Sequence, residues 1–366
     1  MGPAIKPVKA IALISFLAAV TTALPSQDTT SQIRAKIASL QQSLKDHPIA
    51  DKDLAGIASS AADTLRAASD ALHRDQLYLA LENLGHSEDL LHGAQGAADK
   101  SAVEKGGMPA FDLKWNEASL RLTALEKVSQ SRAWNAPLAV RALAESAKGK
   151  TTPLLEGGRG FATANGPTDG LLYVGETKGL ADFYAFCASL QLPTKPHAPL
   201  RSLLPELQAL QAKTNAAFQP PKSIDLHPRF IALNGTLKLA QELDASRSYA
   251  GALHAYLDAV RHYGMLDAPA LSTADQEKLK KDIAAEKKKV ANSANDDSIA
   301  LLFLERAESY SSHPDGSAPT ADEWRSARVI LDQVLPAYYA AQKPAARLAQ
   351  ASTKTVEITL VRWPYT

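Results

Sequence analysis

Apolar residues recur at helical spacing along most of the chain, and the clearest pattern lies between residues 233 and 266. Its first part carries one apolar stripe formed by Leu233, Leu237, Ala240 and Leu243. Its second part carries a matching stripe formed by Tyr249, Ala252, Leu253, Tyr256, Leu257 and Val260. Polar residues 244–248 separate the two parts, and Gly264 can end the second in the left-handed conformation. The pattern predicts two amphipathic helices folded back on each other as a hairpin.

The same periodicity predicts helices on both sides of this hairpin. They cover residues 30–45, 54–72, 77–91, 113–128, 138–148, 180–192, 200–218, 272–289, 299–310 and 324–334. Residues 106–109, 193–199 and 219–223 are rich in proline, glycine or polar residues and predict connectors. We therefore expect an all-α protein of antiparallel helical hairpins, stacked as an α-solenoid or packed as an irregular bundle.

Within the hairpin, the small residue Ala252 is followed four positions later by the aromatic residue Tyr256, and Ala259 follows three positions after that. Leu239 and Ala240 form a large-then-small pair in the preceding helix. This arrangement, which spans about 34 residues, resembles the tetratricopeptide repeat. The resemblance implies stacked hairpins whose concave surface binds a peptide or a protein.

Three positions depart from that family's pattern. Thr236 replaces the usual Trp, Leu243 the usual Tyr, and Gly264 the usual terminal Pro. Weaker echoes of the spacing occur within residues 61–92 and 324–334. A packed helical hairpin of no repeat family is the alternative interpretation, because the same stripes form in unrelated helical pairs.

Residues 149–179 have a different composition, because glycines cluster there together with Pro153 and Pro167. This density of glycine predicts a long loop that is either functional or mobile. Within it, residues 171–174 have the pattern of a short strand. Residues 355–363 alternate between apolar and polar side chains, which predicts a second, half-buried strand. We expect these two segments to pair, and addition of the terminal strand to another protein is the alternative.

The first 23 residues contain Lys6 and Lys9, an apolar run over residues 10–20, and small residues up to Ala23. This order predicts a secretory signal peptide cleaved near Ala23, and the alternative is an uncleaved anchor. The apolar run is too short to span a bilayer as a stable helix. We expect an exported protein, periplasmic or secreted, with no stable membrane span after cleavage.

Composition and pattern together predict five regions in the chain. The expected regions are a signal peptide (1–23), an N-terminal helical region (24–148), a Gly/Pro-rich region (149–223), a C-terminal hairpin region (224–352) and a tail (353–366). Apolar residues make up 45% of the sequence, which is enough for a large core, and the net charge is +1. A charge this small argues against a nucleic-acid partner. The single cysteine, Cys187, lies on an apolar helical face and is expected to be a buried thiol.

Candidate chemistry is most concentrated on the second helix of the hairpin. His254, Asp258 and His262 share one helical face, and together with Tyr249 they form a candidate binding surface. The two histidines are about 12 Å apart along the helix axis, so the three side chains cannot hold one metal ion. We expect these residues to lie on the surface.

Two further groups of polar residues recur at helical spacing. They are His86, Glu88, Asp89 and His92, and Asp296, Asp297, Glu305 and Glu308. The first group lacks the ligand spacing of a metal site, and the second is expected to serve in salt bridges or in contacts with solvent. The sequence indicates no cofactor and no metal.

These patterns favour an exported, noncatalytic binding or scaffolding protein that takes a peptide or protein partner on a helical surface in the cell envelope. The main alternative is an envelope enzyme whose site is assembled around the glycine-rich residues 149–179. A helical metal-binding protein is a third possibility.

Overall fold

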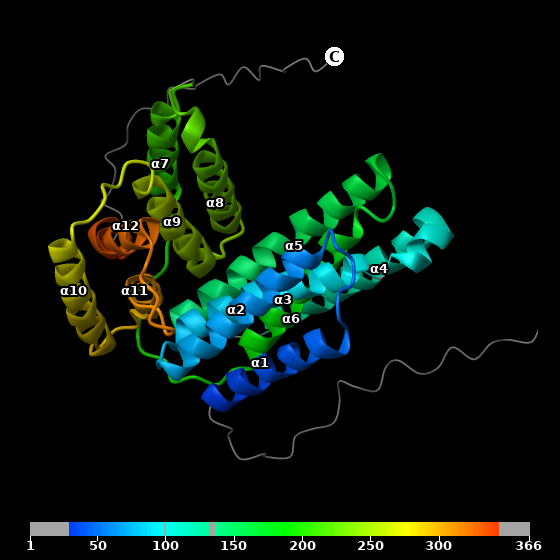
Figure 1. Ribbon diagram of the computed structural model, residues 1–366, viewed down its shortest axis with the longest axis horizontal. Coiled ribbons are helices and arrows are strands. Elements are labelled where there is room, and N and C mark those ends of the chain that lie inside the picture. The colour runs from blue at the N-terminus through cyan, green and yellow to red at the C-terminus, as the bar shows by residue number, and fades with distance from the viewer. Residues whose placement is uncertain (1–28, 99, 132–135, 221, 344–366) are drawn as a thin grey trace, which may run out of the picture.

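The computed structural model describes residues 29–98, 100–131, 136–220 and 222–343, and these residues form helices joined by turns and short connectors (Figure 1). The described residues contain no strand. The prediction of an all-α protein is therefore confirmed.

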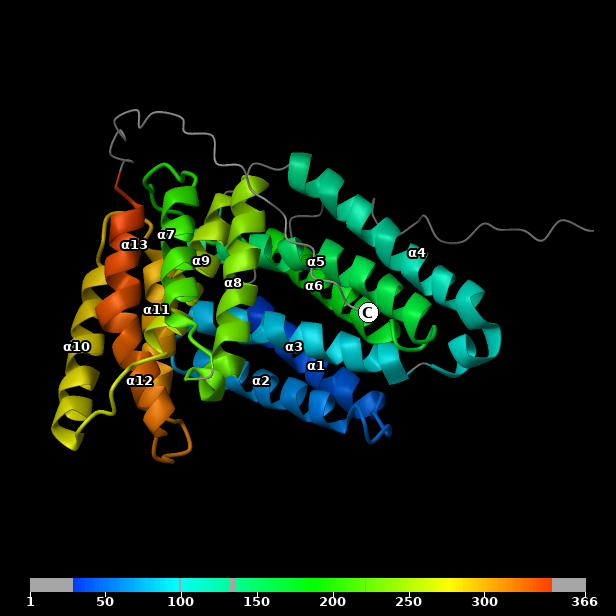
Figure 2. The same cartoon turned by 90° about the horizontal axis from the view of Figure 1, so that it is seen from above.

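The first half of the described chain forms an elongated bundle, the N-terminal bundle. Its helices are α1 (Thr29–Asp46), α2 (Ala55–His73), α3 (Leu77–Ala98), α4 (Ser101–Ser131), α5 (Leu138–Ala164) and α6 (Leu171–Ser189). Helix α6 packs antiparallel to both α3 and α5, and α4 lies along the outer side of the bundle (Figure 2). Gly107, with φ 61° and ψ −152°, breaks α4 into two segments within the predicted connector 106–109.

The second half forms a C-terminal bundle that packs against one end of the first (Figures 1 and 2). Its elements are α7 (Leu204–Ala217), η1 (Ile224–Leu226), α8 (His227–Ala245), α9 (Tyr249–Gly264), α10 (Thr273–Ala291), α11 (Ser298–Ser311), α12 (Ala321–Val329), η2 (Ile330–Val334) and α13 (Leu335–Ala341). The η1 element is a 3-10 turn, and η2 is a π-helical turn.

The hairpin predicted from residues 233–266 is present as α8 and α9. Ala252 is fully buried, and Leu233, Leu237 and Leu243 lie in the core, as their stripe requires. Membership of the tetratricopeptide family stays a prediction, because a helical hairpin alone does not distinguish it from other packed helical pairs.

The prediction of a glycine-rich loop at residues 149–179 is wrong. Most of these residues belong to α5 and α6, joined by a short turn, and the strand predicted at 171–174 is the first turn of α6. The predicted boundary between residues 148 and 149 falls inside α5. Because 171–174 is helical, the two-stranded element is also wrong. The predicted signal peptide (1–23) and terminal strand (355–363) lie outside the described residues.

The glycines of α6 serve close helix packing instead of a loop. A Cβ atom on Gly175 would lie 2.2 Å from the carbonyl oxygen of His92 on α3. A Cβ atom on Gly170, just before α6, would lie 2.3 Å from the carbonyl oxygen of Gly158 on α5. Helix backbones can approach this closely only where side chains are absent. The sequence therefore concentrates glycine at the crossings of α6 with α3 and α5.

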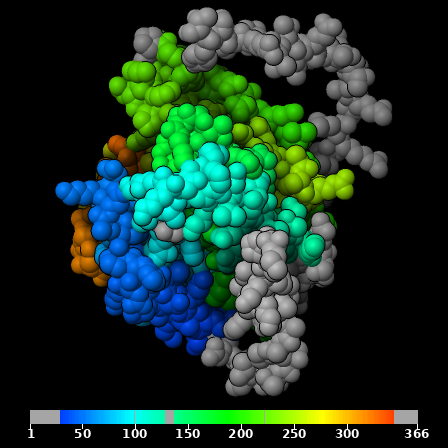
Figure 3. All heavy atoms as spheres, turned by 90° about the vertical axis from the view of Figure 1, so that its right-hand side faces the viewer, coloured from blue at the N-terminus to red at the C-terminus, as the bar shows by residue number. Residues whose placement is uncertain are grey.

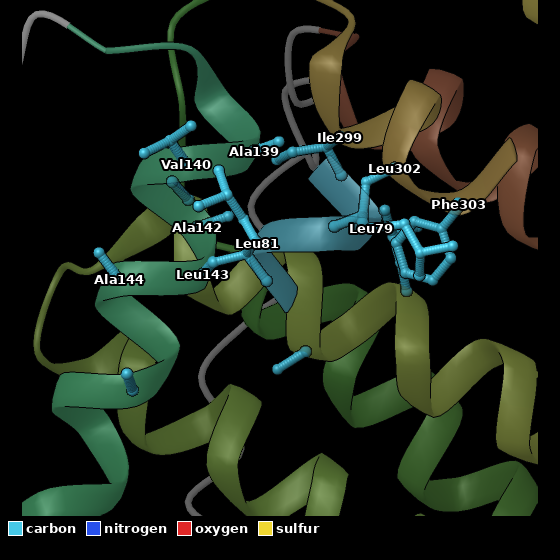
Figure 4. Packing of buried hydrophobic residues seen from close by; sticks show 14 of the residues in the cluster. Leu79, Leu81, Ala139, Val140, Ala142, Leu143, Ala144, Ile299, Leu302 and Phe303 are labelled. Atoms are coloured by element: carbon cyan, nitrogen blue, oxygen red, sulfur yellow. The ribbon is translucent and has the colours of Figure 1, made fainter. Parts of the chain in front are cut away.

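Buried apolar residues connect the two bundles. Leu79 and Leu81 of α3, Val140 and Leu143 of α5, and Phe303 of α11 belong to one continuous core (Figure 4). A smaller core beneath α4 contains Phe111, Ala118, Leu155 and Val174, among others. In the part of the chain that the structure describes, no helix has the length and apolar character needed to cross a bilayer.

Candidate functional site

His254, Asp258 and His262 lie on one face of α9, as their spacing predicts, but this face is packed against α3 and α11 at the junction of the two bundles. His254 is only 8% exposed, and the other two side chains are half-buried. The expectation that these residues lie on the surface is therefore wrong for His254, whereas Asp258 and His262 keep part of their side chains exposed. The buried face of α9 is wider than its apolar stripe. Charged residues of other helices cover part of its polar side.

Arg306 of α11 is the partner that brings these helices together. Its guanidinium group forms a double hydrogen bond with the carboxylate of Glu82 on α3. Its Nη1 donates to Asp258 Oδ1 at 3.0 Å, and the guanidinium group stacks on the ring of Phe303 at 4.7 Å. One buried cation thus links α3, α9 and α11.

His254 completes the contact between α3 and α9. Its Nε2 lies 3.1 Å from Arg306 Nη2 and 3.4 Å from Glu82 Oε1. Its Nδ1 lies 3.5 Å from the hydroxyl of Ser146 on α5, and its ring packs against Phe303 with centroids 5.7 Å apart. The imidazole is therefore held by groups from three other helices, α3, α5 and α11.

The remaining members of this group lie one turn further along α9. Arg261 Nε donates to Asp258 Oδ1 at 2.9 Å, and His262 Nε2 lies 3.8 Å from Asp258 Oδ2. We name the complete group the junction cluster. It consists of Glu82, His254, Asp258, Arg261, His262 and Arg306.

Electrostatics fix the charge state of this cluster. Burial by itself would raise the pKa of Glu82, but the charge of Arg306 and hydrogen bonds from His254 and Arg306 outweigh burial and lower it to about 2. Burial likewise opposes the charge on Asp258, and Arg261 and Arg306 hold its pKa well below the usual range. Burial and the neighbouring Arg261 lower the pKa of His262. Both carboxylates are therefore ionised and matched by arginine.

The group His86, Glu88, Asp89 and His92 is divided between two sides of α3. Glu88 is fully buried and forms an ion pair with Lys36 of α1. Asp89 lies near Lys150 of α5 and Glu176 of α6. Burial raises the pKa of Asp89 to about 6, and burial together with the charge of Asp89 raises that of Glu176 to about 7. Sequence reasoning missed Glu176, because it lies in the segment predicted to be a loop.

Two of the carboxylates predicted to serve in salt bridges or in contacts with solvent, Asp296 and Glu305, have a different role. Glu305 Oε2 accepts a hydrogen bond from the backbone N–H of Leu79 at 2.8 Å, and Asp296 Oδ2 accepts one from that of Leu138 at 2.8 Å. These N–H groups belong to the first turns of α3 and α5, where a helix has unpaired donors. Glu308 does form a salt bridge, with Lys287. Buried carboxylates of the C-terminal bundle thus cap helices of the N-terminal bundle.

Tyr249, the fourth residue of the predicted surface, is separate from the junction cluster. It is half-buried and lines a small apolar cavity with Leu138, Leu203 and Leu253. The cavity has a volume of about 20 Å³. This is enough for roughly one water molecule. It does not hold a larger ligand.

A much larger depression opens between α4 and α5. Its volume is about 440 Å³, and it is lined by Trp115, Glu156, Arg159, Gly160, Thr163 and Ala164. The guanidinium group of Arg159 stacks over the ring of Trp115 at 4.5 Å and forms a salt bridge with Asp112 at 3.1 Å. The indole Nε1 donates to the carbonyl oxygen of Leu155 at 3.0 Å. Sequence reasoning missed this site, because its lining from α5 lies in the segment predicted to be a loop.

The described residues contain no group of three or more His, Cys, Asp or Glu side chains placed to hold a metal ion. Cys187 is fully buried, and burial raises the pKa of its thiol well above the ordinary value, which disfavours a reactive thiolate. No protein-family model matches the chain, and comparisons with curated proteins and with solved structures find no significant match.

Proposed function

We propose that this is an exported, noncatalytic binding or scaffolding protein of the cell envelope, which holds a peptide or protein partner on its helical surface. The observation that carries the proposal is the open depression of about 440 Å³ between α4 and α5. It is lined by helical side chains and contains an aromatic residue and an arginine, Trp115 and Arg159. These residue types contribute most to protein–protein binding energy.

Two side chains of the depression, Trp115 and Arg159, are oriented by contacts within the protein. Trp115 is held by its hydrogen bond to Leu155, and Arg159 is held between Trp115 and Asp112. Such preorganisation favours binding, because little side-chain entropy is lost when the partner docks. The outer face of α4 also exposes Leu113 (68%) and Leu120 (71%), which extends the apolar surface available on that helix.

The junction cluster supports a structural role over a catalytic one. Its arginines and carboxylates are paired with each other, and the carboxylates keep low pKa values that make them weak bases. A general base for catalysis near neutral pH needs a pKa close to 7 and access to substrate.

Two glycines of α5 offer a matched pair of variants to test the proposal. Gly160 lines the depression and Gly157 does not, and a Cβ atom on either residue would meet no atom within 4 Å. We expect Gly160→Tyr to fill the depression and abolish saturable recovery of a partner from an envelope extract. Gly157→Tyr is expected to leave recovery unchanged. If wild type recovers no saturable partner, or both variants recover it equally, the proposal is wrong.

An enzyme is the second candidate, and Glu176 is the observation that favours it. With a pKa of about 7 beside Asp89 at about 6, this side chain could exchange protons near neutral pH. Glu176 and Lys150 both lie within residues 149–179, the segment around which an enzyme site was predicted from the sequence. Turnover of chromogenic esters or glycosides by wild type, lost in Glu176→Gln, would support an enzyme over a binding protein.

A further inference from the structure

Exposed apolar side chains gather where α7 passes into α8. Ile224 is 61% exposed, Ile231 is 60% exposed, and Phe218 is 39% exposed. The η1 turn, which contains Ile224, leads directly into α8, which contains Ile231 seven positions further along the chain. We name Phe218, Ile224 and Ile231 the α7–α8 corner. Figure 3 shows the green segments that contain it at the upper edge of the molecule, above the cyan helix α4.

The corner is rigidly supported from below. The ring of Phe218 packs edge-on against Phe230 with centroids 5.0 Å apart, and Phe230 is buried in the core. Gln211 of α7 donates to Asn234 of α8 at 3.3 Å, which adds a polar contact between the two helices. The exposed apolar side chains are therefore carried by elements that pack on the buried Phe230.

The charge around the corner is positive. Between residues 211 and 238 the charged residues are Lys213, Lys222, Asp225, Arg229 and Lys238, which gives 4 − 1 = +3. Arg229 pairs with Asp322 and Lys238 pairs with Glu242, which leaves Lys213 and Lys222 against Asp225, a net charge of about +1. Lys213 and Lys222 are exposed. Lysine stems can lie along an apolar surface while the ammonium groups reach polar or anionic groups.

Helix α4 provides an internal contrast. Its exposed Leu113 and Leu120 are also seven residues apart, but the charges around them cancel. From residue 104 to 127 the acidic residues are Glu104, Asp112, Glu117 and Glu126, and the basic residues are Lys105, Lys114, Arg121 and Lys127. Two surfaces of similar apolar exposure thus differ in charge.

We propose that the α7–α8 corner docks on an anionic lipid surface. The isoleucines and Phe218 enter the boundary between headgroups and acyl chains, and Lys213 and Lys222 contact the lipid phosphates. A second copy of the chain fits less well, because two positively charged corners repel each other. Three side chains on a convex corner also offer much less than the roughly 800 Å² per partner that a stable protein interface buries. This surface is separate from the depression proposed to hold a partner.

A probe at one residue tests the proposal in the full chain. Ile231→Cys and, as the matched control, Leu120→Cys are each labelled with a polarity-sensitive fluorophore; the native Cys187 is fully buried and does not compete. Both proteins are mixed with vesicles of phosphatidylglycerol or of phosphatidylcholine. We expect a blue shift for the Ile231 probe on phosphatidylglycerol only, and none for the Leu120 probe. Any vesicle contact made by the N-terminal residues is the same in both proteins.

Charge reversal and salt separate lipid docking from other causes of a shift. Lys213→Glu together with Lys222→Glu should remove the shift of the Ile231 probe, and added salt should weaken it. The proposal is overturned if phosphatidylglycerol causes no shift, if the Leu120 probe shifts equally, or if the shift survives charge reversal. It is also overturned if the shift depends on protein concentration without vesicles, which would identify a surface for self-association.

Discussion

Two regions of the molecule hold helices together in opposite ways. Inside the N-terminal bundle, α3 and α6 approach so closely at Gly175 that a Cβ atom there would lie 2.2 Å from a backbone oxygen of α3. At the junction between the bundles, α3, α9 and α11 are joined by the long charged side chains of Glu82, Asp258 and Arg306. The first contact depends mainly on the absence of side chains where the two backbones cross. The second depends on matched charges, so it responds to loss of one partner and to pH.

Removal of the shared cation should have the largest effect on stability. Arg306→Met leaves Glu82 and Asp258 in a buried site without their common partner, and breaking a buried ion pair in this way costs about 3 to 5 kcal/mol. The free energy of unfolding in urea measures this loss. Arg66→Met is the matched control, because the pair of Arg66 with Asp63 is largely exposed and such pairs contribute about 1 kcal/mol or less.

A second variant distinguishes unpaired charge from lost packing at the same site. Combining Arg306→Met with Glu82→Gln and Asp258→Asn removes the uncompensated charges, so we expect it to recover part of the lost stability. If Arg306→Met costs no more than Arg66→Met, the junction is held by its apolar core and the cluster is not important for stability.

Added volume should harm the close crossing in the N-terminal bundle. In Gly175→Ala the new methyl group meets the backbone of α3, so α3 and α6 must separate, and overpacking of this kind costs about 1 to 3 kcal/mol. The loss should be independent of salt, unlike any change at an exposed ion pair. Urea unfolding at low and high salt measures both quantities, and a neutral effect would mean that the two helices are not in contact at Gly175.

The pH dependence of stability should distinguish Glu82 from Glu176 and Asp89, and the buried junction residue Glu305, with a pKa raised to about 8, adds a further loss as the pH rises from about 4.5 to 8. Glu82 has a folded-state pKa of about 2, below its usual value of 4.5, so its contribution is present above pH 4.5 and is lost as the pH falls toward 2. Glu176 and Asp89, at the α3–α6 crossing, have raised values of about 7 and about 6. They favour the folded state when protonated, so stability falls as the pH rises from about 4 to 7.

Glu176→Gln tests the second half of this expectation. One pKa unit corresponds to about 1.4 kcal/mol, and partial exposure reduces the effect, so we expect the loss between pH 5 and 7.5 to shrink by about 1 to 2 kcal/mol in the variant. Glu156→Gln, at an exposed position of α5, is the control and should leave the profile unchanged. Parallel profiles for Glu176→Gln and wild type would contradict the assignment.

The sequence predicted the α8–α9 hairpin correctly because its information is local. Leu233, Leu237 and Leu243 mark one face within a few turns, and a helix with one apolar face must bury it. The glycines of α5 and α6 carry the opposite local signal, since glycine lowers helix propensity. In α6, contacts with α3 override that signal, and Gly93 and Gly96 of α3, which face Gly175, lie far away in the chain.

The candidate site was predictable only in part, for the same reason. Helical spacing places His254, Asp258 and His262 on one face, and the structure confirms this arrangement. Nothing near these residues in the chain indicates Glu82, which precedes Arg306 by 224 residues. Sequence patterns predict that charged residues are exposed to solvent when their partners are distant in the chain. Such residues become buried when folding brings the partners together.

Two neighbouring glycines of α5 should give the smallest changes in stability, and they test directly whether glycine serves close helix packing. A Cβ atom on Gly158 would lie 2.9 Å from Cβ of Tyr173 and 3.0 Å from the carbonyl oxygen of Gly170, whereas one on Gly157 would meet nothing within 4 Å. Gly157→Ala should therefore stabilise the protein by about 0.5 to 1 kcal/mol, because alanine loses less conformational entropy in a helix. Gly158→Ala should destabilise it. Unfolding of both variants in urea measures the difference, and equal effects would mean that glycine serves helix flexibility in α5 rather than close packing against α6.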